Sequence, residues 1–571
     1  MRLKAWQAHE FDARLAKSIS DSFSLPPLIG RLLVQRGISD RSAAHRFLNP
    51  RVEQLHDPFQ LTDFSKTADR LLVAVQKKER IVIHGDYDVD GVASTVMVSR
   101  LLELLGANVC SYIPNRLSDG YGLSSKSVKA LHDEGAQVIV SVDCGIRSVE
   151  AADRAALLGI DLIVTDHHEP GPVLPKAFSI INPRLVGSIY PEMNLSGAGV
   201  ALKLVQGLCQ RTGHDAWLPG FLKLAAIGTV ADVVPLQGEN RVIVKLGLDQ
   251  LSSGPNSVGL DALIEVAGLV GKNIDSENVA FGLVPRLNAA GRMASADLAA
   301  RLLLTTDPAR KREAGLLARE LDDLNTQRQK EQRDVFTMAQ EMIEANSDIR
   351  SHGMIVIARE GWHRGVIGIV ASKLVETFDK PAMVLSVEGD VAHGSARSTP
   401  GFDLLGALDQ CAHLFSQFGG HQMAAGVTLE AKNVIPLKTS LYMYADKMLG
   451  EGQEAKTLHI DAPLEIKELS GEVVAGLNRL KPFGRGNPEP VFQASGVKMV
   501  ERPKLLNNQH LAMSLNQDGH VFRAIAWQSA HWKDFLVGLG DEIDVVYSLM
   551  ENHFRGESTI QLSIADARKA R

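Results

Sequence analysis

One stretch of the sequence decides the fold that we expect, and it reads Ile81-Val82-Ile83-His84-Gly85-Asp86-Tyr87-Asp88-Val89-Asp90-Gly91. Its three β-branched residues are typical of a buried strand, and the loop after them carries one histidine and three aspartates at every second position. Gly91 permits a tight turn into the helical pattern that follows. Carboxylates packed this closely repel one another, so the arrangement would be costly without a cation. The stretch therefore predicts a strand that ends at a metal site.

Two further strand patterns end in the same way. Residues 138–142 lead into Asp143, and residues 162–165 lead into Asp166-His167-His168. Short β-branched runs alternate with helical patterns from about residue 66, which predicts a mainly parallel α/β sheet. Because the carboxyl ends of parallel strands share one edge, where ligands bind, we expect the three loops to converge.

The types of side chain in these loops narrow the choice of metal. Several carboxylates with two or three imidazoles suit Mn²⁺ or Mg²⁺ better than a thiolate-rich zinc site, and they suffice for two ions that share a carboxylate. Two such ions clamp a phosphate, which indicates hydrolysis of a phosphoester or phosphoanhydride. Taken singly, an aspartate after a strand is also common as a helix N-cap, and Asp166 could be a turn residue. The metal site is predicted from the joint pattern.

The rest of the chain shows four other patterns. Residues 308–345 contain one glycine and, after Pro308, no proline, which favours a long helix that joins two lobes over a bundle helix inside one domain. A second α/β pattern follows it. After about residue 452, short alternating segments predict a small all-β module, and the first sixty residues predict a helical preamble.

The fold class that we expect is therefore α/β, with two α/β lobes joined by a long helix and a C-terminal β-barrel. The expected segments are an N-terminal helical extension at 1–65, a catalytic α/β domain at 66–307, the connecting helix at 308–346, a second α/β domain at 347–451 and the barrel at 452–571.

Composition is that of a folded globular protein. The 571 residues are 45% hydrophobic and 22% charged, and Lys+Arg 61 against Asp+Glu 67 gives a net charge of −6. Any nucleic acid must therefore be held by local basic patches. The four cysteines form no C-x-x-C pair, and there is neither a signal-peptide pattern nor an apolar run of membrane-spanning length. We expect a cytoplasmic protein without a membrane partner.

A fourth acidic segment, Gly228-Thr229-Val230-Ala231-Asp232, follows a helical pattern. Together with the three loops above, it closely resembles the four motifs of the DHH phosphoesterase superfamily. Two later segments, Gly394-Ser395-Ala396-Arg397-Ser398 and Phe418-Gly419-Gly420-His421, look like the DHHA1 domain that accompanies it. The β-rich tail resembles an OB-fold. The resemblance, which covers essentially the whole chain, is to the exonuclease branch of the superfamily.

This resemblance implies a 5′→3′ exonuclease that is specific for single-stranded DNA, releases mononucleotides and acts in DNA recombination and repair. It also implies that one ion is held by His84, Asp88 and Asp143, and the other by Asp90, Asp143, His167 and Asp232. Asp143 would then be the bridging and catalytic carboxylate, and His168 would contact the scissile phosphate. Asp86 and Asp166 are assigned a supporting role, in which they orient ligands.

A nuclease of single strands needs groups that donate hydrogen bonds to phosphates along a narrow path, and side-chain faces on which bases can stack. Ser395 and Arg397 are two residues apart, so an extended segment places them on one side for a paired phosphate contact. For each arginine the alternative is a surface or ion-pair residue. Arg485, in a basic and aromatic loop, could contact DNA or belong to a plain structural turn. The full set of candidate substrate-binding residues is Arg116, Asn288, Arg292, Ser395, Arg397, His421 and Arg485.

Two other functions remain open at this point. The same metal site serves oligoribonucleases and cyclic-dinucleotide phosphodiesterases of the superfamily, and a non-catalytic DNA-binding scaffold is a different class altogether. All expected ligands are present, which favours an enzyme. The expected partners are single-stranded DNA and, through the resemblance, single-strand-binding protein, with the chain acting as a monomer.

Overall fold

The structure, a computed structural model, describes residues 5–115, 122–449, 457–540, 542–554 and 557–570. The chain divides into two compact units. One unit combines three separate segments, namely residues 1–55, 233–245 and 454–571, and the other contains residues 56–232 and 246–453. None of the described helices combines the length and the apolar composition that crossing a membrane requires.

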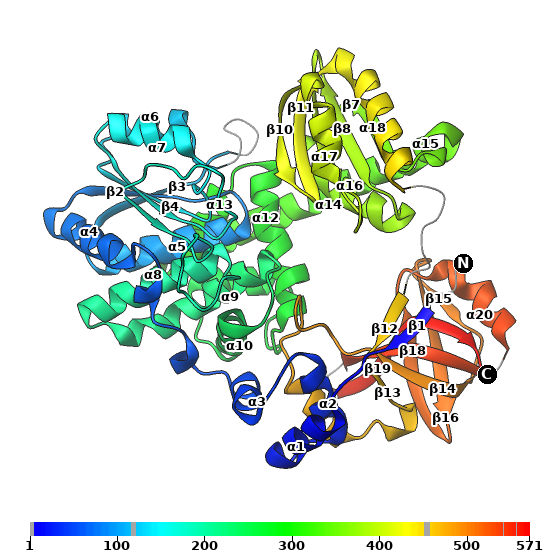
Figure 1. The fold of residues 1–571 in the computed structure, drawn as a ribbon. Helices are drawn as coiled ribbons and strands as arrows, with labels where there is room; N and C mark the ends of the chain where they lie inside the picture. The colour runs from blue at the N-terminus through cyan, green and yellow to red at the C-terminus, as the bar shows by residue number, and fades with distance from the viewer. Residues whose placement is uncertain (1–4, 116–121, 450–456, 541, 555–556, 571) are drawn as a thin grey trace. The chain divides into compact units, whose positions relative to one another are not determined.

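The first lobe of the larger unit is built on a five-stranded sheet of order β3-β2-β4-β5-β6, in which all neighbouring strands are parallel. Helices α6 and α7 cover one face of this sheet, and α4, α5 and α8 lie on the other (Figure 1). The strands are β2 Arg80–His84, β3 Asn108–Tyr112, β4 Val138–Val142, β5 Asp161–Thr165 and β6 Ser179–Ile181. The helices are α4 Phe64–Lys77, α5 Val89–Leu104, α6 Ser125–Asp133, α7 Val149–Leu157, α8 Gly197–Thr212 and α9 Leu222–Ala231.

Both faces of the sheet are covered, because the helices that connect parallel strands pack on them. Every residue of β4 is buried, as are residues 81–84 of β2, and apart from Ser141 and His84 these residues are apolar rather than alternating. The predicted parallel α/β sheet is confirmed, and with it the shared edge at which the strands end.

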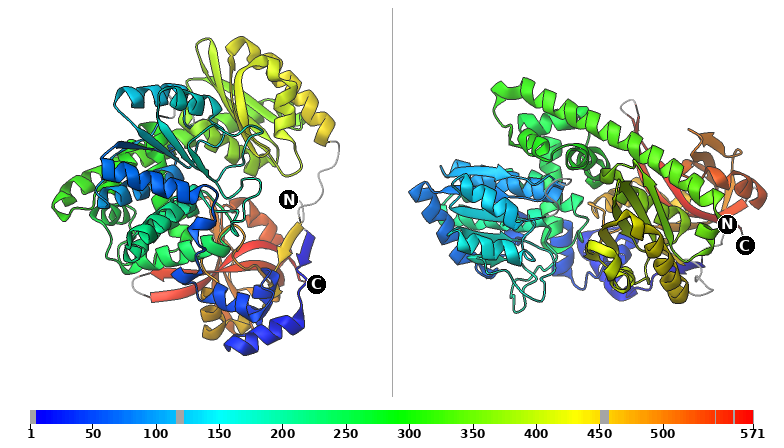
Figure 2. Two further views of the ribbon diagram at one scale, coloured as in Figure 1. Left: turned by 60° about the vertical axis from the view of Figure 1, so that its left-hand side comes forward. Right: turned by 90° about the horizontal axis from the view of Figure 1, so that it is seen from above.

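A long helix, α14 Lys311–Ala345, leads from this lobe to the next, after a short 3₁₀ turn at Pro308–Arg310 (Figure 2, right, green). Its first half packs on α11 Val258–Val266, α12 Val284–Met293 and α13 Asp297–Leu304. Its second half buries Val335, Ala339 and Ile343 in the core of the second lobe. The expected joining helix is therefore confirmed.

The second lobe carries a five-stranded sheet of order β10-β11-β9-β8-β7. Only β7 and β8 pair in parallel, so this sheet is mixed. The strands are β7 Ile355–Glu360, β8 Ala382–Glu388, β9 Val391–Arg397, β10 Phe415–His421 and β11 Ala424–Glu430. The accompanying helices are α15 Ser347–Ser351, α16 Arg364–Phe378, α17 Leu404–Gln410 and α18 Val434–Leu449.

The smaller unit contains the expected β-barrel. Strand β14 pairs with β18, then β19, β17 and β16 follow in order, and β16 pairs back with β14, which closes a five-stranded barrel. These strands are β14 Phe492–Met499, β16 His510–Gln517, β17 His520–Ala526, β18 Glu542–Phe554 and β19 Glu557–Lys569. Around them lie β12 Thr457–Ile460, β13 Ala462–Pro463, β15 Lys504–Leu506, α19 Gly471–Asn478 and α20 Lys533–Leu539.

The first residues of the chain belong to the same unit as the barrel. Helices α1 Ala13–Phe23, α2 Pro27–Gln35 and α3 Arg41–Leu48 form the expected helical stretch, and their apolar side chains share one core with the barrel. One strand was not expected, since β1 Ala5–Ala8 pairs in parallel with β12. The short segment 233–245, which contains the start of α10 Gly238–Ser253, also lies in this unit.

Candidate metal centre

The predicted acidic and histidine residues meet at the carboxyl edge of the first sheet. His84 is the last residue of β2, Asp143 directly follows β4, and residues 166–168 directly follow β5. Asp232 reaches the same place from the end of α9, where it is the C-cap residue. The three loops therefore converge, as the parallel strands require.

His167 lies at the middle of the cluster. Its Nε2 atom lies 3.1 Å from Asp143 Oδ1 and 4.0 Å from Asp90 Oδ2, and its Nδ1 atom lies 3.6 Å from Asp232 Oδ2. Ligand atoms of Asp90, His167 and Asp232 all lie within 4.8 Å of one another, a spacing that one ion can span.

A second group of ligand atoms lies beside the first. Asp86, Asp88 and Asp143 offer carboxylate oxygens within 4.8 Å of one another, and Asp143 also offers a ligand atom within that distance of His167 and His168. Asp86 is 2% exposed and offers a ligand atom of its own, whereas the sequence assigned it only the orientation of another ligand. Asp88 also caps α5, because its Oδ1 accepts the backbone N–H groups of Asp90 and Gly91 at 3.1 Å. The capping and ligand interpretations of this residue are therefore compatible.

Asp90 is held by a feature that sequence reasoning missed. Its carboxylate accepts the backbone N–H groups of Gly197 and Ala198, at 2.7 and 2.8 Å, which are the first residues of α8. A helix N-terminus favours negative charge, so α8 stabilises the ionised carboxylate. The sequence does carry a signal, since the N-cap Ser196 is followed by small residues that let a side chain approach the backbone.

His84 is more deeply buried than the other candidate ligands and belongs to neither of the groups just described. Its ring packs beside Tyr112, with 5.2 Å between ring centroids, and its Nδ1 lies 3.9 Å from the Sγ of the buried Cys144. Burial lowers the pKa of His84 to about 4. The imidazole is therefore neutral at physiological pH, which is the form that binds a metal.

The pKa values of the adjacent residues His167 and His168 are shifted in opposite directions. Burial lowers the pKa of His167, which keeps it neutral. Burial acts in the same direction on His168, but the 2.7 Å hydrogen bond from its Nδ1 to Asp166 and the charge of Asp166 outweigh it and raise the pKa of His168 to about 9. His167 is thus neutral, which is the form that binds a metal, and His168 is protonated and can donate a hydrogen bond.

Asp166 organises this loop. Its Oδ1 accepts the backbone N–H groups of His167 and His168, at 2.7 and 3.1 Å, and its Oδ2 accepts that of Ile146 at 2.9 Å. Burial would raise the pKa of Asp166, but the hydrogen bond and charge of His168 hold it below its usual range. The turn and supporting interpretations are thus compatible here as well.

The cluster has the properties of a site for divalent cations. Burial, together with the negative charge of Asp232, raises the pKa of Asp90 to about 8, and burial and the Asp90 charge raise that of Asp143 well above its usual value. Three buried ligand atoms, His84 Nε2, Asp143 Oδ1 and His167 Nε2, form no hydrogen bond within the described part of the chain. Cations would remove the repulsion and satisfy these atoms, so the residues fit Mn²⁺ or Mg²⁺.

The candidate DNA contacts of the first lobe lie on α12. Asn288 Oδ1 accepts the backbone N–H of Val89 at 3.2 Å, so this residue braces the metal-binding loop. Arg292 donates to the carbonyl of Gly365 at 3.3 Å. Arg116 lies outside the described residues.

The candidate contacts of the second lobe lie at the ends of two strands. Ser395 and Arg397 lie on the same side of β9, as their spacing predicts, because both face Gly368 of α16. His421 ends β10 and is exposed. Partial desolvation of the ring and the positive charges of Arg147 and His168 lower the pKa of His421, against the negative charge of Glu169. The charge of the His421 ring therefore interacts with that of His168.

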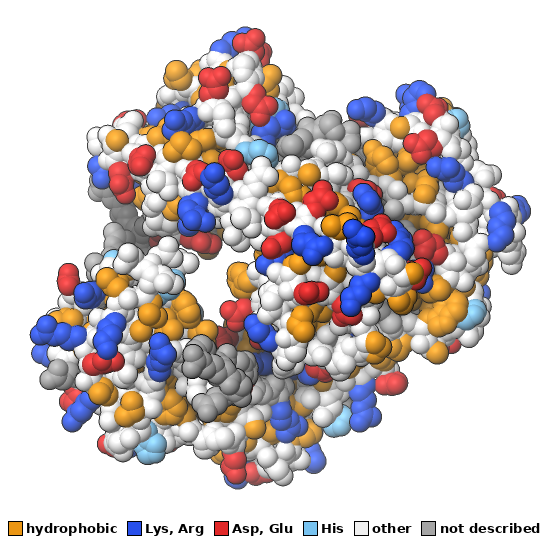
Figure 3. All heavy atoms as spheres, turned by 180° about the vertical axis from the view of Figure 1, so that it is seen from behind, with side chains coloured by type: hydrophobic (Ala, Val, Ile, Leu, Met, Phe, Trp, Pro, Cys, Tyr) orange, Lys and Arg blue, Asp and Glu red, His pale blue; other side chains and the backbone are white. Residues whose placement is uncertain are grey.

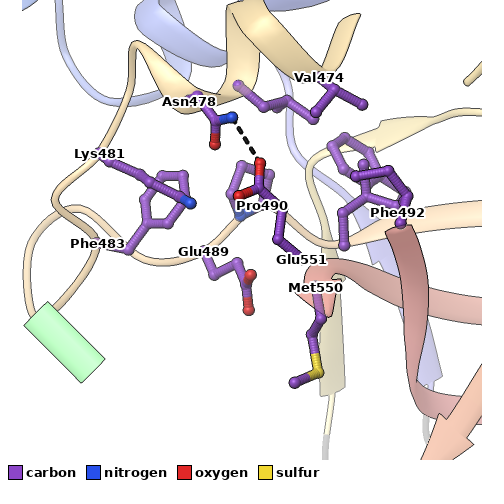
Figure 4. A pocket seen from close by; sticks show the side chains of 12 residues that line it. Val474, Asn478, Lys481, Phe483, Glu489, Pro490, Phe492, Met550 and Glu551 are labelled. Atoms are coloured by element: carbon purple, nitrogen blue, oxygen red, sulfur yellow. Dashed lines mark hydrogen bonds between the residues drawn. The ribbon is translucent and has the colours of Figure 1, made fainter. Parts of the chain in front are cut away.

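Arg485 lies in an ordered turn of the barrel unit. The buried Asn487 donates to the carbonyls of Leu480 and Pro482, at 2.8 and 2.7 Å, and so fixes the turn, while the Arg485 side chain is exposed. Lys481 and Phe483 of this turn line a small pocket with Glu489 and Met550, and Asn478 donates to Glu551 at its edge at 2.7 Å (Figure 4). The backbone around Arg485 is thus a structural turn, and the Arg485 side chain is accessible to solvent.

Basic and acidic side chains are mixed on the surface that Figure 3 shows. On the face shown in Figure 3, lysine and arginine side chains are interspersed with aspartate and glutamate, without a large field of one sign. On this face, any contact with a polyanion must therefore come from individual basic groups.

Comparison with known proteins gives the same architecture. The chain matches the DHH family N-terminal domain at residues 80–229, the DHHA1 domain at 352–440 and the RecJ OB domain at 460–566. It is 38% identical to the single-stranded-DNA-specific exonuclease RecJ of Bacillus subtilis, across 98% of this chain and 70% of that protein. It is 35% identical to RecJ of Escherichia coli, across 95% of both chains. The crystal structure of Thermus thermophilus RecJ with Mn²⁺ superposes with a TM-score of 0.83 at 30% identity, covering 99% of this chain and 80% of that one.

The fold and the cluster define a metal-dependent phosphoesterase of the DHH class. RecJ of T. thermophilus has been solved with Mg²⁺ as well as Mn²⁺, which agrees with the ligand types found here. The chain belongs to the RecJ family of single-stranded-DNA-specific exonucleases.

Proposed function

We propose that this chain degrades single-stranded DNA from the 5′ end and releases mononucleotides, by phosphodiester hydrolysis with two divalent ions, in DNA recombination and repair. One observation carries the proposal. Acids and imidazoles from three strand ends and one helix end meet in one cluster, and buried ligand atoms of His84, Asp143 and His167 form no hydrogen bond within the described residues. Family membership supplies the substrate class.

The ligands divide into two sets that share Asp143. Asp90, Asp143, His167 and Asp232 would hold one ion, and His84, Asp88 and Asp143 would hold the other, with Asp86 next to the second set. When bound, such ions supply Lewis-acid stabilisation of the phosphate charge and lower the pKa of water. The protein's own part is to fix the ligands, through the N-terminus of α8 at Asp90 and the backbone of α5 at Asp88.

His168 is assigned to the scissile phosphate. Its Nδ1 is hydrogen-bonded to Asp166, which fixes the ring orientation and favours the cationic form. A cationic imidazole next to the ligand His167 is suited to donate a proton to a phosphate oxygen and to stabilise the charge that develops there. Asp166 acts through His168 and is a positioning residue.

The DNA path is assigned to accessible cationic and polar groups. In the second lobe, Ser395, Arg397 and His421 would hold phosphate near the 5′ end, and Arg292 of α12 adds a guanidinium. Arg485 would contact the strand in the barrel unit, since OB-folds often bind single strands through basic and aromatic groups.

We place the protein in the cytoplasm, as a monomer with single-strand-binding protein as a partner. The four cysteines, Cys110, Cys144, Cys209 and Cys411, are all free thiols, as expected in a reducing compartment.

Digestion of end-labelled DNA tests the proposal. Single-stranded and duplex substrates, labelled at either end, are incubated with Mn²⁺, Mg²⁺ or a chelator, and parallel reactions contain short RNA, a cyclic dinucleotide or pyrophosphate. We expect a 5′ label to be released at once as a mononucleotide from single strands only, and only with metal. Faster turnover of RNA or a cyclic dinucleotide would instead assign another activity of the DHH superfamily, and DNA binding without hydrolysis would assign a scaffold.

A further inference from the structure

Two proposed ligands of the same ion are held by neighbouring helices of the first lobe. The carboxylate of Asp90 accepts the first two backbone N–H groups of α8. Asp232 is the C-cap residue of α9, and its own N–H donates to the carbonyl of Gly228 at 3.0 Å. Both acids offer ligand atoms within 4.8 Å of one another and of His167. The distance between the two carboxylates therefore depends on how the start of α8 meets α9.

Helices α8 and α9 pack closely where they meet. A Cβ at Gly228 would lie 2.5 Å from the Cβ of Ala198 and 2.8 Å from Asp90 Oδ1. This close approach leaves no room for a side chain at residue 228, but contact between small apolar groups has no directional preference. Packing alone therefore does not fix where along α8 the last turn of α9 lies.

A hydrogen bond between two side chains crosses this contact. The hydroxyl oxygens of Ser196 and Thr229 lie 2.9 Å apart, and both residues are fully buried. Ser196 is the N-cap of α8, where its Oγ also accepts the N–H of Gly199 at 2.9 Å. Thr229 lies on α9, three residues before Asp232. Because a buried hydroxyl without a partner is costly, this directional bond holds α9 in register with the first turn of α8.

We propose that Thr229 is a positioning residue for the metal centre, which fixes the spacing of Asp90 and Asp232 through the hydrogen bond that it shares with Ser196. The inference rests on the metal site of the proposed function. It concerns one of the two ions, because both acids belong to one ligand set and the other set contains neither. Loss of the bond should therefore weaken the binding of that ion and leave the other ion in place.

The test measures Mn²⁺ binding by calorimetry in the whole chain and four variants. Thr229→Val keeps the shape of the side chain but removes the hydroxyl. Ser196→Gly removes the bond from the other helix, and it serves if Thr229→Val fails to fold, because glycine is tolerated as an N-cap. Thr229→Ser keeps a hydroxyl. Thr67→Val is the control, because Thr67 donates to Ser179 at 2.8 Å in another buried hydroxyl pair of this lobe, between α4 and β6, which carry no proposed ligand.

We expect the Kd of one Mn²⁺ ion to rise about tenfold in Thr229→Val and Ser196→Gly, and that of the other to stay within about twofold. Both Kd values should stay within about twofold of the parent in Thr229→Ser and Thr67→Val. With single-stranded DNA, the Mn²⁺ concentration for half-maximal kcat should rise about tenfold in the first two variants. Excess Mn²⁺ should restore their kcat, which it would not do for a folding defect.

Mn²⁺ affinities of Thr229→Val and Ser196→Gly that match the parent would overturn the proposal. An equal change in Thr67→Val, or a failure of Thr229→Ser to retain binding, would overturn it as well. Because metal binding needs no substrate, a parent that binds two Mn²⁺ ions but leaves DNA intact would contradict the proposed activity and not this inference. A parent that binds no Mn²⁺ would contradict both.

Discussion

Gly197 lies against Asp143 so closely that a Cβ at residue 197 would be 2.3 Å from Asp143 Oδ1. The same glycine donates its N–H to Asp90. One residue at the start of α8 thus borders two of the proposed ligands, and its lack of a side chain leaves the space that Asp143 occupies.

Gly197→Ala should therefore displace Asp143 without unfolding the lobe. We expect Mn²⁺ affinity and nuclease activity to fall by about 10- to 100-fold, measured by calorimetry and by release of labelled nucleotide. Gly220→Ala is the matched control, because a Cβ at Gly220 meets no atom within 4 Å and this glycine has no left-handed φ. Equal activities of the two variants would contradict the close approach.

Asp143→Asn should abolish nuclease activity while the protein stays folded, because the shared carboxylate is lost. The chelator-treated variant should melt roughly 2 °C higher than the chelator-treated parent, because the substitution removes one of several buried carboxylates that repel one another. Mn²⁺ at about 100 times its Kd should stabilise the parent by about 2.7 kcal/mol and the variant by much less. Near-normal activity of the variant would refute the bridging assignment.

Asp166→Asn tests the support of His168. The amide oxygen can still accept the N–H groups of His167 and His168, but the amide NH2 cannot accept that of Ile146, and the neutral group no longer favours a cationic imidazole. We therefore expect kcat to fall about 10- to 100-fold with KM and Mn²⁺ affinity little changed. In a His168→Ala background the same substitution should add almost nothing, because its effect passes through the histidine. Additive losses in this double-mutant cycle would show that Asp166 acts by another route.

Arg397→Ala should weaken the hold on phosphate in the second lobe. We expect KM for single-stranded DNA to rise about tenfold with kcat largely retained, since a charge-assisted contact of about 1.4 kcal/mol is lost. Arg359→Ala removes an exposed arginine from β7 of the same sheet and should leave KM unchanged. A fall in kcat alone would assign Arg397 to the chemical step instead.

Arg485→Ala tests the barrel contact through its salt dependence. If Arg485 contacts one phosphate, the slope of log affinity against log salt should become shallower by about 0.7, the value for one contact to a single strand. Arg502→Ala, at another exposed position of the barrel unit, is the control. An unchanged slope for Arg485→Ala would reject the contact.

Local sequence patterns were enough to predict the metal-binding chemistry of the site and most of the elements around it. The sequence predicts that Asp143 and His167 meet, because both follow a buried β-branched run within two residues and parallel strands end at a common edge. The joining helix and the alternating strands of the barrel were equally visible, since hydrophobic periodicity is a local property.

How distant segments of the chain meet is visible only in the folded structure. The pairing of β1 with β12, the hold of α8 on Asp90 and the place of residues 233–245 in the barrel unit all join parts of the chain that no local pattern connects. The physical reason is that backbone pairing and helix-terminus contacts use N–H and C=O groups, which every non-proline residue carries alike. Which partner such a group finds is therefore set by the packing of the whole chain.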